Sequence, residues 1–157
     1  MPLLVEPLIA SFNLTMSKYP PSPEVFGAEM GSALETFVRP ILNMTGGNFL
    51  GWVSPTPQII SISRVPRPDS SIYGMQLGKI IETSFRTIQT RNQLGPIQIP
   101  EGMLPAQLIN FFRVTNNPTG SILAGQMGKA IDAFARMCIV TSVDVTSGGT
   151  PIIGPIQ

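Results

Sequence analysis

Three segments of this chain are variants of one sequence, and this internal repeat is the strongest constraint on the fold. The copies are VFGAEMGSALETFVRP from Val25, IYGMQLGKIIETSFRT from Ile72 and ILAGQMGKAIDAFARM from Ile122, aligned without gaps at offsets of 47 and 50 residues. The 157 residues are therefore predicted to form a single domain of three repeats, at about 5–55, 56–103 and 104–157. The repeat leaves open whether the units form a line or a closed threefold cluster.

Each copy carries a ladder at four-residue spacing, made of two small residues, an acid and a base. Because residues four apart share one face of an α-helix, the ladder predicts a helix in each copy. The acid precedes the base by one turn, which is the favourable order for an ion pair within a helix. The ladders are Gly27, Gly31, Glu35 and Arg39; Gly74, Gly78, Glu82 and Arg86; and Ala124, Gly128, Asp132 and Arg136.

The glycines of the ladder should weaken these helices unless they have a use. Glycine inside a helix costs about 0.5–1 kcal/mol relative to alanine. Small residues at this spacing let a second backbone approach closely. The small face is therefore predicted to be a helix contact, either inside the chain or between subunits.

A second face of each copy is apolar at spacings of three and four residues, which is typical of an amphipathic helix. This stripe begins at Phe26, Tyr73 and Leu123 in the three copies. Cys138 ends the third stripe and is the only cysteine, so it is predicted to be a buried thiol. One such helix cannot bury its apolar face alone, but three packed together can enclose a small core.

Pro- and Gly-rich stretches follow the helices, and a shorter apolar segment precedes each one. The β-branched run Ile139–Thr146 predicts a strand after the third helix. The segment LPAQLINFF from Leu104 is typical of a short helix, whereas PQIISISRV from Pro57 alternates like a strand. We therefore expect an α+β fold, or a mainly α one, with three pseudo-repeated amphipathic helices joined by Pro/Gly-rich loops with short strands.

The composition excludes several classes of function. The chain has no histidine and one cysteine, which excludes a Ser-His-Asp triad, a Cys-His pair and a Cys/His zinc site. The net charge of +1 disfavours a nucleic-acid partner. Each acid of the ladders has a basic residue one helical turn away; the acids are Glu35, Glu82 and Asp132. Neutralisation by that base explains these acids more simply than a catalytic role does. We predict no catalytic residue, metal, cofactor or small-molecule substrate, so the chain is not expected to be an enzyme.

Neither a signal peptide nor a membrane span is expected. The segment MPLLVEPLIASFNLT has no basic residue before its apolar stretch, and Glu6 interrupts that stretch. The uncharged run at residues 40–63 is broken by several Gly and Pro. A cytoplasmic location is expected unless the chain belongs to a virion.

The surface should be unusually apolar, because charged residues make up 12% of the chain while its long loops carry Ile, Phe, Leu and Trp. Monomers seldom expose large apolar patches, so neighbouring subunits are expected to cover these loops. The tail TPIIGPIQ is expected to lie extended over a neighbour, and Trp52 is either a loop anchor on the core or an interface contact. The possible interface residues are Phe49, Trp52, Ile152, Ile153 and Ile156.

The last part of the chain carries three short motifs: AIDAF at 130–134, IVTSVDVTSGGTP at 139–151, and the ending GPIQ. Together they resemble small virion proteins of tailed bacteriophages, in which an amphipathic helix ending in Ala-Phe precedes a Val/Thr run and a Gly-Thr-Pro tail. The resemblance implies a structural role in the tail, baseplate, neck or capsid. Its implied partners are further copies of the chain and other subunits of the same particle.

The resulting expectation is a non-enzymatic structural subunit of a large assembly, a phage virion. The alternative is a membrane- or envelope-associated protein that uses its apolar loops on lipid, although few and scattered basic residues disfavour adsorption to anionic lipid. An enzyme working with Asp, Glu, Lys or Ser alone is a third alternative, and no constellation supports it.

Overall fold

The long helix of each repeat is present where its ladder places it. The computed structural model describes residues 3–17, 22–65, 70–113 and 120–157. The long helices are α2 (Pro23–Val38), α4 (Ser70–Arg86) and α6 (Gly120–Met137), and the aligned copies begin at the third residue of each. With two small antiparallel sheets beside the helices, the expected α+β, mainly α fold is confirmed.

A shorter helix precedes each long one: α1 (Val5–Ser17), α3 (Thr56–Ser63) and α5 (Met103–Phe111). The short helix predicted from LPAQLINFF is confirmed. The strand suggested by PQIISISRV is wrong, because Ile59 and Ile62 face the core at helical spacing. Pro57 lies in the first turn of α3, where a missing N–H costs little.

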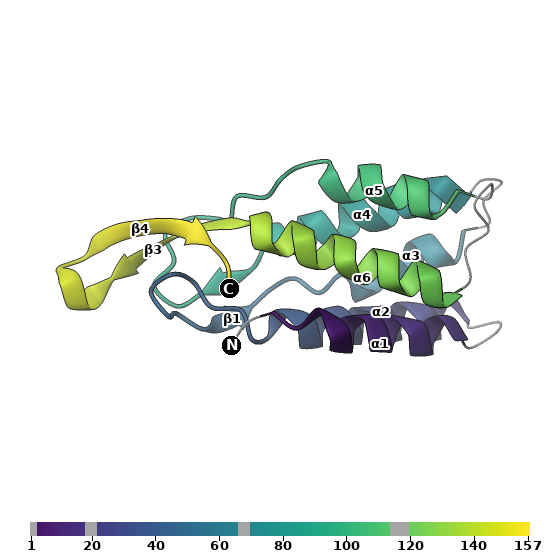
Figure 1. Cartoon of the computed structure of the whole chain (residues 1–157), viewed down its shortest axis with the longest axis horizontal. Coiled ribbons are helices and arrows are strands. Elements are labelled where there is room, and N and C mark those ends of the chain that lie inside the picture. The colour runs from purple at the N-terminus through teal and green to yellow at the C-terminus, as the bar shows by residue number, and fades with distance from the viewer. Residues whose placement is uncertain (1–2, 18–21, 66–69, 114–119) are drawn as a thin grey trace.

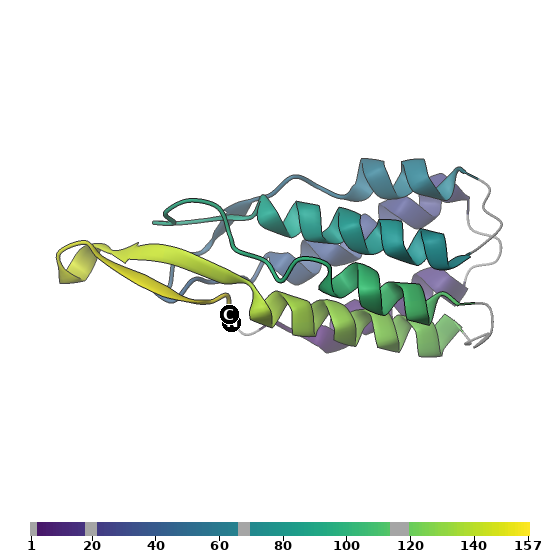
Figure 2. The same ribbon diagram turned by 90° about the horizontal axis from the view of Figure 1, so that it is seen from above.

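The helices of the described chain form a closed ring with approximate threefold symmetry (Figures 1 and 2). Each long helix packs against the short helix that follows it, so α2 lies on α3 and α4 on α5, while α6 returns to α1. The three long helices run in the same direction. Of the two arrangements that the repeat left open, the structure is therefore the closed cluster.

The small faces of the long helices make these ring contacts. A Cβ at Gly31 would lie 1.6 Å from Thr56 Oγ1, one at Gly78 2.5 Å from Pro105 N, and one at Gly128 2.4 Å from Ile9 Cγ1. Gly27 and Gly74 approach α3 and α5 in the same way, and Ala124 is fully buried. The contact that was expected inside the chain or between subunits is thus inside the chain.

The apolar stripes meet along the axis of the ring and form one core. Phe85 and Phe134 pack edge to face with ring centroids 5.2 Å apart. Cys138 is buried, as predicted. Burial raises the pKa of its thiol to about 12, and the charge of Glu82 adds to this effect.

The stretches after the long helices leave the same end of the ring, which we call the arm end (Figure 1). Arm 1 is residues 39–55, arm 2 is 87–102 and arm 3 is 138–157. They contain β1 (Phe49–Gly51), β2 (Gln89–Thr90), β3 (Ile139–Asp144) and β4 (Thr150–Pro155). The predicted strand over Ile139–Thr146 ends at Asp144, because Asp144 Oδ1 accepts a 2.9 Å hydrogen bond from Thr146 N and starts a 3₁₀ turn, Val145–Ser147.

Each arm is hydrogen-bonded to the other two. Arms 1 and 2 pair through β1 and β2, and the buried Asn43 amide of arm 1 donates to Thr90 Oγ1 at 3.1 Å. Arms 2 and 3 join where Gln98 and Ile139 exchange both backbone bonds at 2.8 Å. Arms 3 and 1 join where Leu42 and Gln157 do the same at 2.9 Å. The arms thus satisfy much of each other's backbone, and the expectation that neighbouring molecules shelter them stays a prediction for their exposed apolar side chains.

Candidate functional site

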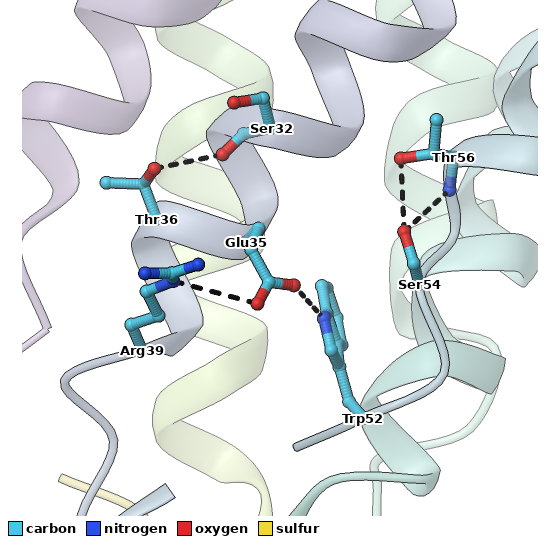
Figure 3. Close-up of polar contacts among 7 residues, drawn as sticks. All are labelled: Ser32, Glu35, Thr36, Arg39, Trp52, Ser54 and Thr56. Atoms are coloured by element: carbon cyan, nitrogen blue, oxygen red, sulfur yellow. Dashed lines mark hydrogen bonds and ion pairs between the residues drawn. The ribbon is translucent and has the colours of Figure 1, made fainter. Parts of the chain in front are cut away.

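The acidic position of the first ladder lies between two donors (Figure 3). Glu35 Oε1 is 3.7 Å from Arg39 Nε, as the predicted ion pair requires, and Glu35 Oε2 accepts a hydrogen bond from Trp52 Nε1. The Trp52 ring packs edge to face on Phe85 with centroids 5.8 Å apart. Trp52 is partly buried in this position, so the structure supports its role as a loop anchor.

The predicted ion pair of the second ladder is wrong. Glu82 is 7% exposed, and its carboxylate accepts from Gly102 N at 3.1 Å and Leu104 N at 3.0 Å. It therefore caps the N-terminus of α5, where unpaired N–H groups favour a negative charge. Arg86 turns away and pairs with Glu101.

The third ladder forms its predicted pair, since Arg136 Nε lies 2.9 Å from Asp132 Oδ2. Arg136 also donates to the Leu3 carbonyl at 3.1 Å, which ties α6 to the segment before α1. The three acids thus serve helix contacts and lie on different helices. Among the described residues, no group of three His, Cys, Asp or Glu side chains is placed to share a metal ion.

Arm 3 projects beyond the helices as a hairpin (Figure 2). One face of this hairpin is apolar. Directly opposed residues of β3 and β4 share a face, which places Ile139, Thr141 and Val143 with their partners Pro155, Ile153 and Pro151. Leu94 of arm 2 lies beside Thr141, to whose carbonyl it donates at 2.7 Å. We call these seven uncharged residues the hairpin face.

Much of the hairpin face is open to solvent. Ile153 is 70% exposed, Leu94 48% and Ile139 38%, whereas Val140 and Ser142 on the opposite face are fully buried. An exposed apolar face without charges marks a contact surface more often than a solvated one.

The free edge of β4 is poorly suited to pairing with another strand. In β3, the backbone N–H and C=O groups of alternate residues bond to arm 2 rather than to β4; these residues are Ile139, Thr141 and Val143. Their partners in β4 therefore direct their own backbone groups away from β3, toward the free edge; these partners are Pro155, Ile153 and Pro151. Two of these three residues are prolines and have no N–H to donate. The hairpin is therefore available through its face rather than through its edge.

A second apolar feature is a groove of about 440 Å³ between α1 and α2, which we call the α1/α2 groove. Arg39 is the one charged residue of its lining, and its side chain is 71% exposed. The groove begins at the arm end, because Arg39 and Pro40 start arm 1. Its lining residues are Leu4, Pro7, Leu8, Ser11, Ala33, Thr36, Phe37, Arg39 and Pro40.

The five residues expected at an interface occupy different surroundings. Phe49 and Trp52 pack partly against the core, Ile152 is partly buried, and Ile156 is 2% exposed. The tail pairs with β3 of its own chain as β4, so it does not lie free for a neighbour as expected. Ile153 remains the exposed member of the set.

Sequence reasoning missed Leu94, Ile139 and Val145, which are exposed apolar residues of the arms. The alternation of the β3 strand was a signal for Ile139, because its neighbour Val140 is buried. Leu94 and Val145 depend on how the arms fold, and no local pattern indicates them.

Comparisons with protein-family models, curated proteins and solved structures find no match to this chain. Among the described residues, no helix combines the length and the apolar character needed to cross a bilayer.

Proposed function

We propose that this protein is a non-enzymatic structural subunit of a large assembly and joins its neighbours through the arm end. The hairpin face is the single observation that carries this proposal, because it is apolar, uncharged and held in place by three hydrogen-bonded arms. The small faces of the helices are occupied within the ring, so contacts between molecules must use other surfaces, of which the hairpin face is one.

The size of the hairpin face favours a role in a repeated array. Full burial of an exposed Ile or Leu side chain is worth about 1.5–3 kcal/mol. Three such side chains, Leu94, Ile139 and Ile153, are partly buried already, while association costs about 4–15 kcal/mol. One hairpin face therefore holds two molecules weakly, and several contacts for each subunit make an assembly stable.

The resemblance of residues 130–157 to small virion proteins of tailed bacteriophages supports a place in such a particle. We accordingly propose a virion role in the tail, baseplate, neck or capsid.

Native mass spectrometry over a range of concentrations tests the proposal. We expect complexes larger than one chain to grow with concentration, and Ile153→Glu to reduce them. Val65→Glu is the matched control, because Val65 is 56% exposed at the end of α3 and lies outside the arms. A wild-type protein that stays a single chain at high concentration would overturn the proposal.

Contact with a lipid surface is the alternative use of the same apolar face. It is less well supported, because the hairpin face contains no Lys or Arg to meet anionic headgroups. Flotation of the purified protein with anionic liposomes separates the two functions, since clear binding would favour the lipid alternative.

A further inference from the structure

We propose that two copies of this chain form a closed pair in which the hairpin tip of each copy (residues 144–149) occupies the α1/α2 groove of the other. This inference rests on the proposed function and names the partner and the contact. The contact would join an apolar turn, the hairpin tip, to the α1/α2 groove. Each of these two features carries one charged residue, and both lie at the arm end of the molecule.

The hairpin tip is a preformed apolar knob. Val145 is 69% exposed at the start of the 3₁₀ turn, and Gly148 and Gly149 have φ values of 82° and 83° that close the turn. Asp144 Oδ1 accepts two hydrogen bonds, one donated by Thr146 N and one by Thr146 Oγ1. The tip is therefore ordered before contact, which lowers the entropy lost on binding.

The α1/α2 groove offers a matching surface. Its volume of about 440 Å³ accommodates a short aliphatic side chain together with the flanking backbone. Leu8 and Phe37 are buried beneath it, whereas Leu4 at its rim is 53% exposed. A valine entering the groove would cover this apolar rim as well as itself.

The charges of the two features are complementary. Asp144 is the one charged residue of arm 3, and Arg39 is the one charged residue of the groove lining. A carboxylate has about four acceptor sites, so the Asp144 carboxylate can accept from a guanidinium in addition to its hydrogen bonds from Thr146 and Ser147. Arg39 meets Glu35 through Nε at 3.7 Å, so its terminal nitrogens can donate to a second carboxylate.

The position of the two features selects a closed pair over a filament. The hairpin projects along the long axis from the arm end (Figure 1). The α1/α2 groove begins at that same end, because Arg39 and Pro40 belong to its lining. Head-to-tail stacking would place a hairpin against the opposite end of the helices. Two molecules with their arm ends facing each other bring both tips to both grooves, which is the reciprocal contact of a two-fold interface.

Sedimentation equilibrium of the full chain tests this contact. We expect a reversible dimer, a dissociation constant at least about ten-fold weaker for Val145→Glu, and no change for Val65→Glu. Circular dichroism and the melting temperature should show that each variant folds, since both substituted positions are exposed.

A charge exchange adds a readout that a general effect on stability would not give. We expect Arg39→Glu and Asp144→Lys each to weaken the dimer, and the double variant to recover most of the lost affinity. If the wild type associates but Val145→Glu does not weaken it, or the double variant is no tighter than the singles, the proposed contact is overturned while the structural function stands. A wild type that never associates overturns both.

Discussion

Replacing Gly78 with alanine should destabilise the fold, although alanine is the better helix former. Gly78 lies on the face of α4 that meets α5. A Cβ at this position would be 2.5 Å from Pro105 N, 2.7 Å from Pro105 Cα and 2.8 Å from Leu104 C. All three are backbone atoms, so no side-chain rotation relieves the contact.

The cost follows from how far α5 must move. The distance to Pro105 N is about 0.9 Å short of the 3.4 Å at which ordinary contact begins. Overpacking of this kind costs about 1–3 kcal/mol. The movement of α5 also stretches the hydrogen bonds that Gly102 N and Leu104 N donate to the Glu82 carboxylate, at 3.1 and 3.0 Å. It therefore weakens a helix cap that is worth about 1 kcal/mol. The gain in helix propensity of about 0.5–1 kcal/mol offsets part of this.

Gly125→Ala provides a matched control within α6. No atom lies within 4 Å of a Cβ built at Gly125, so the propensity gain should appear there without a packing cost. For a chain of this size 1 kcal/mol shifts the melting temperature by about 2–4 °C. We expect Gly125→Ala to raise it by about 1–4 °C and Gly78→Ala to lower it by at least about 2 °C.

Thermal and urea unfolding of the two alanine variants measure this difference in sign. Gly128→Ala should cost less than Gly78→Ala, because its closest atom is Ile9 Cγ1, which side-chain rotation can move, while Ile9 Cα lies 3.5 Å away in ordinary contact. Gly31→Ala should not be relieved in this way, because Thr56 Cβ at 2.8 Å is fixed to the backbone of α3. If Gly78→Ala is as stable as Gly125→Ala, the close approach of α4 to α5 is not what requires the glycine.

Three further predictions concern buried polar groups. Glu82→Gln removes the charge that caps α5 and should lower the free energy of unfolding by about 1–2 kcal/mol, more than Glu35→Gln does; equal losses in urea unfolding would contradict the capping role. Asn43→Ala should lower the free energy of unfolding by about 1–3 kcal/mol, because the Asn43 side chain forms hydrogen bonds across two arms, with Thr90, Arg91, Thr45 and Gly47. Unchanged hydrogen-exchange rates of the backbone amides in the arms would refute this prediction. The Cys138 thiol, with its pKa raised to about 12, should resist iodoacetamide at pH 8 until the chain unfolds. The thiol ionises at a lower pH in the unfolded chain than in the folded one, so the free energy of unfolding should fall as the pH rises from 9 to 12. The fall should be steeper than in Cys138→Ala by up to about 1.4 kcal/mol per pH unit. Parallel pH profiles of the two proteins would exclude the effect.

The helices were predictable because their signals are local. A ladder at four-residue spacing requires only that one segment be helical, and all three segments are. Closure of the ring was not predictable, because it depends on α6 meeting α1 from the other end of the chain. The same limit applies to Glu82, since its spacing to Arg86 suits an ion pair but its burial depends on where α5 begins.

The candidate surface was predictable only in outline. The β-branched residues correctly predicted a strand that begins at Ile139. They did not predict the turn after Asp144, because Val145 and Thr146 are also β-branched and continue the strand pattern. The low charge indicated exposed apolar loops. Which of them stay exposed depends on pairing between arms, and this is why Ile156 is buried while Ile153, three residues earlier, is 70% exposed.

The approximate threefold symmetry belongs to the helices and not to the arms. Each small face is filled by the next short helix, so the ring has used its three equivalent contacts internally. The arms that leave the ring are unequal: arms 1 and 2 pair through strands of three and two residues, while arm 3 forms a hairpin of two six-residue strands that projects furthest from the helices (Figure 2). The arms therefore offer a partner one hairpin rather than three equivalent surfaces. We therefore expect the hairpin to be one of several unequal contacts of each subunit, and the repeat to explain how the fold closes rather than how many neighbours it has.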